Sequence, residues 1–276
     1  MSLYHVIVLA IVQGLTEFLP VSSSAHLATI PALLGWNDPG LNELDFDIAL
    51  HVGTLAAILI YFWRDWVQVI AHGLGLPYRD TQPGEHNRML LWLLVAATIP
   101  GAVFGVAFNK YAEHMLRNPF IIGTAMIVLG LVMWIADRAS QEKTTLDAVT
   151  WTDAIAVGCA QALAIIPGVS RSGSTISMGR FRNLDREVAT RFSFLLSAPI
   201  IAGSALKDVI DLRKTPLPPE MRLPWILGIL VSGVVGIFVI GFLLKYLQRH
   251  NLSIFVWYRV AFGIIVIALA FFRIGG

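Results

Sequence analysis

Long uninterrupted apolar blocks restrict what this chain can fold into. Six of them are long enough to cross roughly 30 Å of hydrocarbon as a helix. They lie near residues 46–63, 89–108, 119–136, 189–206, 225–244 and 253–272. Only 14% of the residues are charged, whereas a soluble domain carries about a quarter. The sequence therefore predicts an all-α polytopic membrane protein with six transmembrane helices.

The chain shows no shift in composition, so we expect a single integral membrane domain over residues 1–276. Its formal net charge is +2, and the basic residues lie in short loops between apolar blocks. Nucleic-acid binding requires a continuous basic patch, which this pattern does not provide. The phospholipid bilayer is the expected environment.

Two regions, residues 2–36 and 151–185, do not resemble simple spans. Each consists of two short apolar pieces interrupted by Pro, Gly and Ser. Irregular backbone at membrane depth is tolerated only where protein or a wet cavity satisfies its polar groups. We therefore predict two re-entrant helical hairpins, each entering and leaving the membrane on one side.

The two broken regions also resemble each other in sequence. A shift of 148 positions brings Gln13 onto Gln161 and Val21-Ser22 onto Val169-Ser170. Three predicted spans separate the hairpins, and because that number is odd, the second hairpin must point opposite to the first. This is an inverted-topology repeat, whose site is expected near the membrane midplane where the broken helices meet.

Counting Lys and Arg on the two sides predicts the orientation. One side has eleven: Arg64, Arg79, Arg88, Arg138, Lys143, Arg180, Arg182, Arg186, Arg191, Lys245 and Arg249. The other has seven: Lys110, Arg117, Lys207, Arg213, Lys214, Arg222 and Arg273. The first side is expected to be cytoplasmic, so the first hairpin opens from the outer face.

The first hairpin places acid, hydroxyl and imidazole groups in an apolar stretch. Gln13 and Glu17 are four residues apart and share a helical face. Ser23 and His26 are one turn apart if a second helix begins there, close enough for a nucleophile and its base. Ionisable residues at membrane depth are costly, which makes them functional candidates. The structural alternative is that Ser22 caps the second helix and His26 binds a backbone carbonyl.

The second hairpin has the features of a phosphate site. Pro167-Gly168 stops one helix, and a hydroxyl-rich run opens the next, whose N-terminal amides favour an anion. Arg171 adds a planar fork of donors that matches phosphate oxygens. The alternative is an Arg171 that only pairs with Glu17. The expected phosphate contacts are Ser22, Ser24, Ser170, Ser172, Gly173, Ser174 and Thr175. His51 and Arg259, also inside apolar blocks, are weaker candidates for the same pocket.

The two motifs, Gln13–His26 and Pro167–Thr175, resemble those of the bacterial undecaprenyl-diphosphate phosphatase family, which is linked to bacitracin resistance. The resemblance extends over essentially the whole chain and includes Phe46–His51 and Tyr258-Arg259. It implies a six-span bundle with two inverted hairpins in the bacterial inner membrane. It further implies removal of the terminal phosphate from a C55 polyprenyl diphosphate with the help of Mg²⁺ or Ca²⁺, which returns the lipid carrier to cell-wall synthesis.

Carried over by position, the family's acidic pair maps to Gln13 and Glu17, and its hydroxyls map to Ser22 and Ser23. Its histidine maps to His26 and its phosphate-binding arginine to Arg171. Many relatives carry Glu where this chain has Gln13, so one carboxylate of a possible metal site is missing here. Glu17 is then the expected metal ligand, and Gln13 is an expected substrate contact. The oligomeric state, including a homodimer, stays open.

The expected catalytic set is thus Glu17, Ser23, His26 and Arg171. Ser23 attacks the terminal phosphate with His26 or Glu17 as base. If Glu17 instead binds the metal, His26 is the base. Direct attack by a water molecule is the remaining alternative. A transporter is the rival class, because inverted repeats with broken helices are typical of transporters. A flippase for the same polyprenyl phosphate would use the same pocket, although transport needs no nucleophile.

Overall fold

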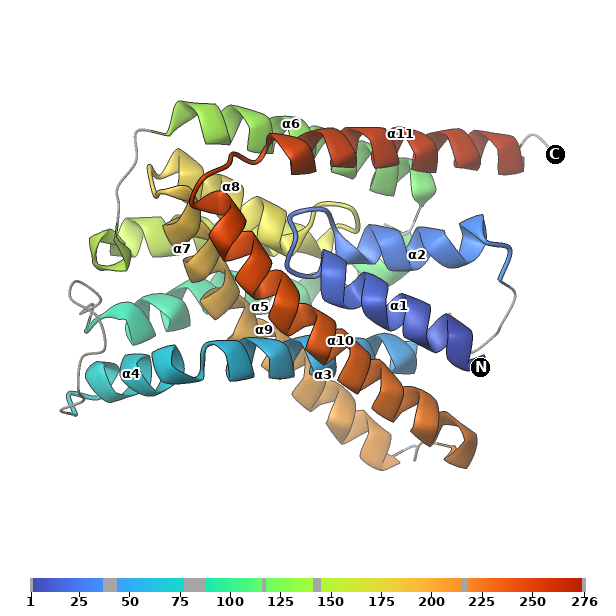
Figure 1. Ribbon diagram of the computed structural model, residues 1–276, viewed down its shortest axis with the longest axis horizontal. Coiled ribbons are helices and arrows are strands. Elements are labelled where there is room, and N and C mark those ends of the chain that lie inside the picture. The colour runs from blue at the N-terminus through green and yellow to red at the C-terminus, as the bar shows by residue number, and fades with distance from the viewer. Residues whose placement is uncertain are drawn as a thin grey trace.

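The computed structural model describes residues 2–36, 44–76, 88–115, 118–140, 145–214 and 218–274. The regular structure of these ranges is helical (Figure 1). The α-helices are α1 (Leu3–Thr16), α2 (Ser23–Leu33), α3 (Leu44–Tyr61), α4 (Trp63–Gly73), α5 (Leu90–Met115), α6 (Pro119–Ala139), α7 (Trp151–Ala162), α8 (Arg171–Phe181), α9 (Arg186–Lys214), α10 (Pro219–Leu247) and α11 (Ser253–Ile274).

The predicted spans correspond to long apolar helices. Five helices, α5, α6, α9, α10 and α11, are individually long and apolar enough to cross a membrane. The predicted span at 46–63 coincides with α3. This helix counts as a candidate membrane span only together with α4, and the axes of the two helices are bent by 72° at their junction. The bend coincides with a change in composition: residues 55–61 at the end of α3 are apolar apart from the Tyr61 hydroxyl, whereas α4 carries Arg64, Asp65, Gln68 and His72.

Both predicted hairpins are pairs of short helices. Helices α1 and α2 have 14 and 11 residues, and α7 and α8 have 12 and 11, whereas a span needs about 20. Figure 1 shows the two hairpins entering from opposite ends and meeting at their turns. The turns also match in conformation, since Ser22 (φ 75°) and Ser170 (φ 71°), related by the 148-residue shift, both have positive φ.

Helix packing follows the same internal symmetry. Helix α1 packs on α10 of the second half, α7 packs on α5 of the first half, and α6 pairs with α11. The crossing of α3 and α10 depends on Gly53, where a Cβ atom would collide with the Ile229 carbonyl and the Ser232 side chain. Small residues of this kind let membrane helices approach closely.

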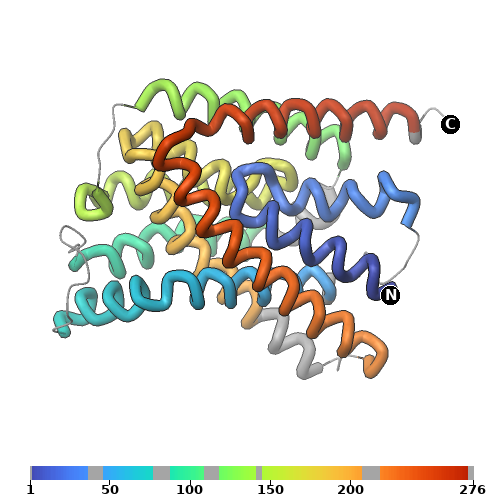
Figure 2. The backbone as a smooth tube through the Cα atoms, in the orientation of Figure 1, coloured from blue at the N-terminus to red at the C-terminus, as the bar shows by residue number. Residues whose placement is uncertain are grey.

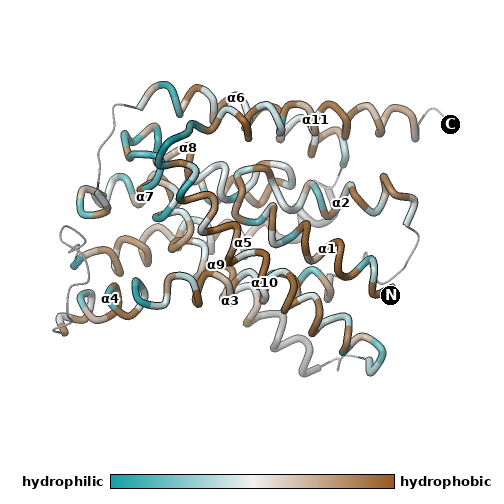
Figure 3. The backbone as a smooth tube through the Cα atoms, in the orientation of Figure 1, coloured by the Kyte–Doolittle hydropathy of each residue, from teal (hydrophilic) through white to brown (hydrophobic). Residues whose placement is uncertain are grey.

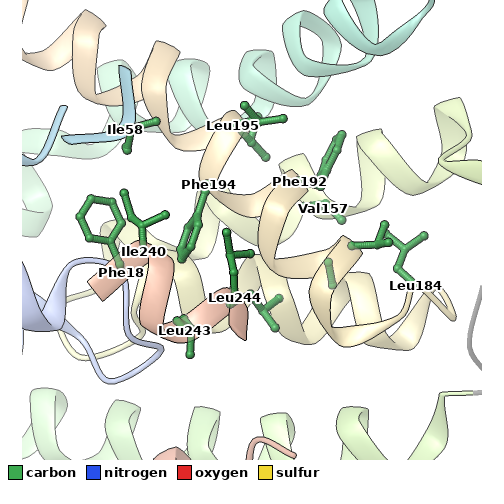
Figure 4. Close-up of a cluster of buried hydrophobic side chains, with 14 of the residues drawn as sticks. Phe18, Ile58, Val157, Leu184, Phe192, Phe194, Leu195, Ile240, Leu243 and Leu244 are labelled. Carbon is green, nitrogen blue, oxygen red and sulfur yellow. The ribbon is translucent and has the colours of Figure 1, made fainter. Parts of the chain in front are cut away.

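The largest hydrophobic cluster begins at Phe18 in the turn of the first hairpin and extends along α9 (Figure 4). Phe18 is fully buried, and its ring packs edge-to-face on Phe194 of α9 at 5.5 Å between centroids. Ile240 and Leu243 of α10 belong to the same cluster. Because Phe18 directly follows Glu17, this packing fixes the position of the Glu17 backbone.

The outer surface is apolar. Figure 3 shows hydrophobic residues along most of α10 and α11, and hydrophilic ones at the connection between them. Val106, Phe238 and Phe272 are 89%, 73% and 81% exposed, as expected for side chains that contact lipid. Both termini lie at the same end of the molecule (Figure 2), which agrees with an even number of crossings.

Candidate functional site

The Glu17 carboxylate is the centre of a polar cluster between the two hairpin turns. Its Oε2 accepts hydrogen bonds from Ser23 Oγ at 2.6 Å and from Gln13 Nε2 at 3.1 Å. Its Oε1 accepts one from Arg171 Nη2 at 2.9 Å. His51 Nε2 lies 3.8 Å from Oε2. The structure therefore brings together five of the residues that the sequence singled out, from both hairpins and α3.

Ser23 is the first residue of α2, and the chain enters this helix through the left-handed backbone of Ser22. The Ser22 side chain does not form the cap that the structural alternative required, and Ser22 Oγ lies 3.2 Å from Ser24 Oγ instead. The Ser23 hydroxyl has the Glu17 carboxylate as its hydrogen-bond acceptor. A hydroxyl that donates to a buried carboxylate is arranged for deprotonation.

His26 has two other partners. Its Nδ1 lies 2.7 Å from the Ser22 carbonyl oxygen, and its Nε2 lies 2.6 Å from the Tyr258 hydroxyl. Because a carbonyl can only accept, Nδ1 carries a proton, and in the neutral ring Nε2 accepts from the tyrosine. The ring also stacks on Phe262 at 4.2 Å between centroids. The backbone contact of the structural alternative is thus present, and Tyr258 is a partner that the sequence analysis did not assign.

Arg171 joins the hairpins and keeps an open donor. It begins α8 and is held by Glu17 through Nη2. Its Nη1 is buried and has no hydrogen-bond partner among the described residues. A buried guanidinium nitrogen without a partner is costly, and an anion placed between the two turns would satisfy it. The ion pair with Glu17 therefore leaves one guanidinium nitrogen of Arg171 unused as a donor within the described residues.

The serines and threonine of the second hairpin bind mainly the protein's own backbone. Ser170 Oγ caps α8 by accepting from the Gly173 amide at 3.1 Å. Ser172 Oγ donates to Leu19 O at 3.1 Å, which ties the second turn to the first. Ser174 and Thr175 donate to the Arg171 carbonyl at 3.0 and 2.8 Å. These hydroxyls hold the turn and the start of α8 in shape.

Arg259 binds the backbone of both hairpin turns. It is fully buried. Its Nη1 donates to Pro20 O at 3.2 Å in the first turn, and its Nη2 donates to Gly168 O at 2.8 Å and Val169 O at 3.2 Å in the second. Its Nε donates to Met126 O of α6 at 3.1 Å. Arg259, a weaker sequence candidate for the substrate pocket, therefore donates to backbone carbonyls of both turns and of α6.

A divalent cation has two ligands available. Among the described residues no three His, Cys, Asp or Glu side chains gather as a metal cage. However, Gln13 Oε1 is a buried acceptor that has no hydrogen-bond partner in that part of the chain, and it belongs to the side chain that contacts Glu17. Amide and carboxylate oxygens suit Mg²⁺ or Ca²⁺, and Mg²⁺ sites often take further ligands from substrate phosphates. The donor set fits such an ion.

This chain is similar to known proteins over nearly its whole length. A family model described as bacitracin resistance protein BacA matches residues 6–265. A protein of Moorella thermoacetica named undecaprenyl-diphosphatase is 46% identical over 273 residues, covering 99% of this chain and 100% of the relative. A protein of the same name from Desulforudis audaxviator is 47% identical, covering 99% of this chain and 100% of the relative. Another from Gemmatimonas aurantiaca is 46% identical, covering 97% of this chain and 98% of the relative.

Proposed function

Because this chain belongs to the family of the bacitracin resistance protein BacA, we propose that it hydrolyses undecaprenyl diphosphate to undecaprenyl phosphate and inorganic phosphate. One observation supports this proposal most strongly. A serine hydroxyl on a buried carboxylate and a buried guanidinium with an open nitrogen meet where the two hairpin turns touch. The prenyl chain stays in the bilayer, and the reaction returns the carrier to cell-wall synthesis.

Arg171 binds the terminal phosphate through its open Nη1. The amides of Arg171 and Ser172 begin α8 and have no intrahelical acceptor, so they add donors at the positive end of the helix dipole. Charge accumulates on the phosphoryl oxygens during transfer, and fixed donors of this kind stabilise it. Arg171 remains anchored to Glu17 through Nη2, which holds the guanidinium in place as the substrate enters.

Ser23 is the nucleophile in this proposal, and Glu17 is its base. Glu17 takes the Ser23 proton as Oγ attacks the terminal phosphorus, and the bridging P–O bond breaks to release undecaprenyl phosphate. After the carboxylate has passed this proton to solvent, it activates a water molecule that cleaves the phosphoserine and restores Ser23. His26 binds Ser22 O and Tyr258, and so it fixes the start of α2 on which Ser23 lies.

Gln13 and Glu17 would hold a divalent cation of the Mg²⁺ or Ca²⁺ type. Such an ion neutralises charge on the phosphate oxygens when it is bound. His51, 3.8 Å from Glu17 Oε2 and half-exposed, borders the same space and is placed to contact the diphosphate.

The protein is a multi-pass membrane protein, and the bacterial cytoplasmic membrane is its proposed location. The excess of basic residues on the side of the second hairpin supports an outward-facing opening of the first hairpin. The pocket would then receive its substrate from the periplasmic or outer face.

The direct test is phosphate release from undecaprenyl diphosphate in detergent by the wild type, Arg171→Ala and Ser23→Ala. We expect release by the wild type and loss of nearly all of it in both variants. If only Arg171→Ala were inactive, water would be the nucleophile. If the wild type bound the lipid but released no phosphate with either Mg²⁺ or Ca²⁺, the proposal would fail and lipid transport would become the better explanation.

A further inference from the structure

Helix α4 turns an apolar stripe away from the rest of the protein. The exposed residues of this stripe follow helical spacing: Trp63, Val67, Ile70 and, at the C-cap, Leu74. The stripe continues the exposed apolar surface at the end of α3, which includes Leu59 and Ile60. A surface helix of a soluble domain buries such a stripe against the core. The outward face of α4 therefore requires an apolar environment, and the bilayer that α3 contacts is continuous with it.

The inward face of α4 is held to the bundle by polar contacts at both ends. Near its start, Asp65 pairs with Arg191 of α9. In the next turn the Gln68 side chain is buried. At the other end, the indole nitrogen of Trp92 donates to the Gly73 carbonyl oxygen at 3.0 Å and ties α4 to the start of α5. These contacts fix the direction in which α4 runs.

That direction separates α4 from the helix that crosses the membrane. Helix α3 has 18 residues, which correspond to about 27 Å and nearly match the roughly 30 Å of hydrocarbon. The chain then bends by 72°. Along the axis of α3, the 11 residues of α4 therefore advance by about 5 Å instead of about 16 Å. Helix α4 thus runs mainly along the membrane surface, at the depth where α3 ends.

Aromatic and basic residues at the ends of α4 fit the boundary between hydrocarbon and headgroups. Trp63 and Arg64 are both exposed, and the Arg64 guanidinium lies over the Trp63 ring at 5.2 Å from its centroid. Trp92, which holds the other end of α4, is also exposed. Tryptophan rings concentrate at membrane–water interfaces, and an arginine there extends its charged group toward water while its stem covers apolar surface.

We propose that α4 is an interfacial helix whose partner is the lipid surface. Its apolar stripe lies in the boundary between acyl chains and headgroups, as amphipathic helices of this kind do, and Arg64 contacts lipid phosphate. The leaflet is the one in which α3 ends, which the count of basic residues predicts to be cytoplasmic. The crossing that begins with α3 is then complete near Tyr61, and α4 adds no further depth. This inference stands independently of the proposed hydrolysis.

The test measures the depth of spin labels on the full chain in vesicles of phosphatidylethanolamine and phosphatidylglycerol. A Cys159→Ser background removes the one cysteine of the sequence. Labels are then attached singly at Val67→Cys and Leu74→Cys, seven residues apart on the stripe. Ile99→Cys and Val106→Cys are the matched control, because both positions are exposed and lie seven residues apart on the spanning helix α5. Power saturation with oxygen and a water-soluble nickel chelate gives each depth.

We expect the labels at 67 and 74 to differ in depth by about 3 Å and those at 99 and 106 by about 10 Å. Both α4 labels should lie about 5–10 Å into the headgroup–acyl boundary. A difference on α4 as large as that on α5 would show that α4 continues the span. Free access of the nickel chelate to both α4 labels would place the helix in water. Either result would overturn the proposal, and the α5 pair in the same vesicles verifies insertion of the chain.

Discussion

Replacing Glu17 with Gln tests the assignment of the base. The side chain keeps its size, and its amide can still accept a hydrogen bond from Arg171, whose Nη2 now lies 2.9 Å from Oε1. It can no longer take the proton that Ser23 donates at 2.6 Å. The substitution therefore removes proton transfer and leaves most of the packing around Phe18 unchanged.

The expected loss is large and falls on kcat. General-base catalysis contributes about 10²–10⁴-fold, which at about 1.36 kcal/mol per tenfold corresponds to roughly 2.7–5.4 kcal/mol of the activation barrier. Substrate affinity should change little, because the amide oxygen in Glu17→Gln still accepts from Arg171 and keeps the guanidinium in place. A fall in kcat at nearly constant KM is the signature of an interaction made in the transition state.

The assay is phosphate release from undecaprenyl diphosphate over a range of substrate concentrations. Asp153→Asn is the matched control, because Asp153 is also a fully buried carboxylate that pairs with an arginine, Arg182 at 2.7 Å. It lies at the start of α7, at the far end of the second hairpin from its turn, and should keep kcat within about threefold. If Glu17→Gln kept more than a tenth of the wild-type kcat, or if Asp153→Asn lost as much, the reasoning would be refuted.

Three further outcomes are expected. Tyr258→Phe removes the hydroxyl that lies 2.6 Å from His26 Nε2. This substitution should lower kcat several-fold and alter the pH–rate profile, and an unchanged profile would argue against this contact. Arg259→Leu leaves the carbonyls of both turns without their donor, and at about 1–3 kcal/mol for each unsatisfied group the melting temperature in detergent should fall clearly, with activity lost in parallel. Gln13→Glu supplies a second carboxylate next to Glu17 and should lower the Mg²⁺ or Ca²⁺ concentration needed for half-maximal phosphate release; no change on titration of either ion would exclude Gln13 as a ligand.

The apolar blocks were sufficient to predict the membrane helices, because such helices need long apolar runs. The breaks at Pro20 and Pro167 were sufficient to predict the hairpins, because interrupted helices at membrane depth must have their backbone polar groups satisfied by surrounding protein. The span at 46–63 was placed correctly, but its bend into α4 was not predicted, since the change in direction at Phe62 depends on tertiary contacts. Glu17, Ser23 and Arg171 were singled out because polar groups are costly in such surroundings. The structure brings the three side chains together, and their catalytic roles stay a prediction.

Other features depended on contacts between residues far apart in sequence. Tyr258 reaches His26 across 232 positions, and its only sequence signal was its place beside Arg259 in an apolar block. The hydroxyls near Arg171 were expected on phosphate, yet residues such as Thr175 bond to the backbone, because short polar side chains satisfy nearby carbonyls first. The meeting of Arg180 and Arg186 at Asp137, whose Oδ1 lies 3.2 and 2.7 Å from their Nε atoms, also required the three-dimensional arrangement.

The attachment of both turns to Arg259 has a consequence for biogenesis. Every residue that acts on phosphate in the proposed mechanism is synthesised before residue 180, but the guanidinium that holds the turns together is in α11, the last helix of the described chain. A nascent chain that has inserted only its first five spans already contains the residues that join the turns directly, Arg171 with Glu17 and Ser172 with Leu19. It still lacks the donor for the carbonyls of both turns, so we expect the site to reach its final rigidity only when the last span enters the bilayer.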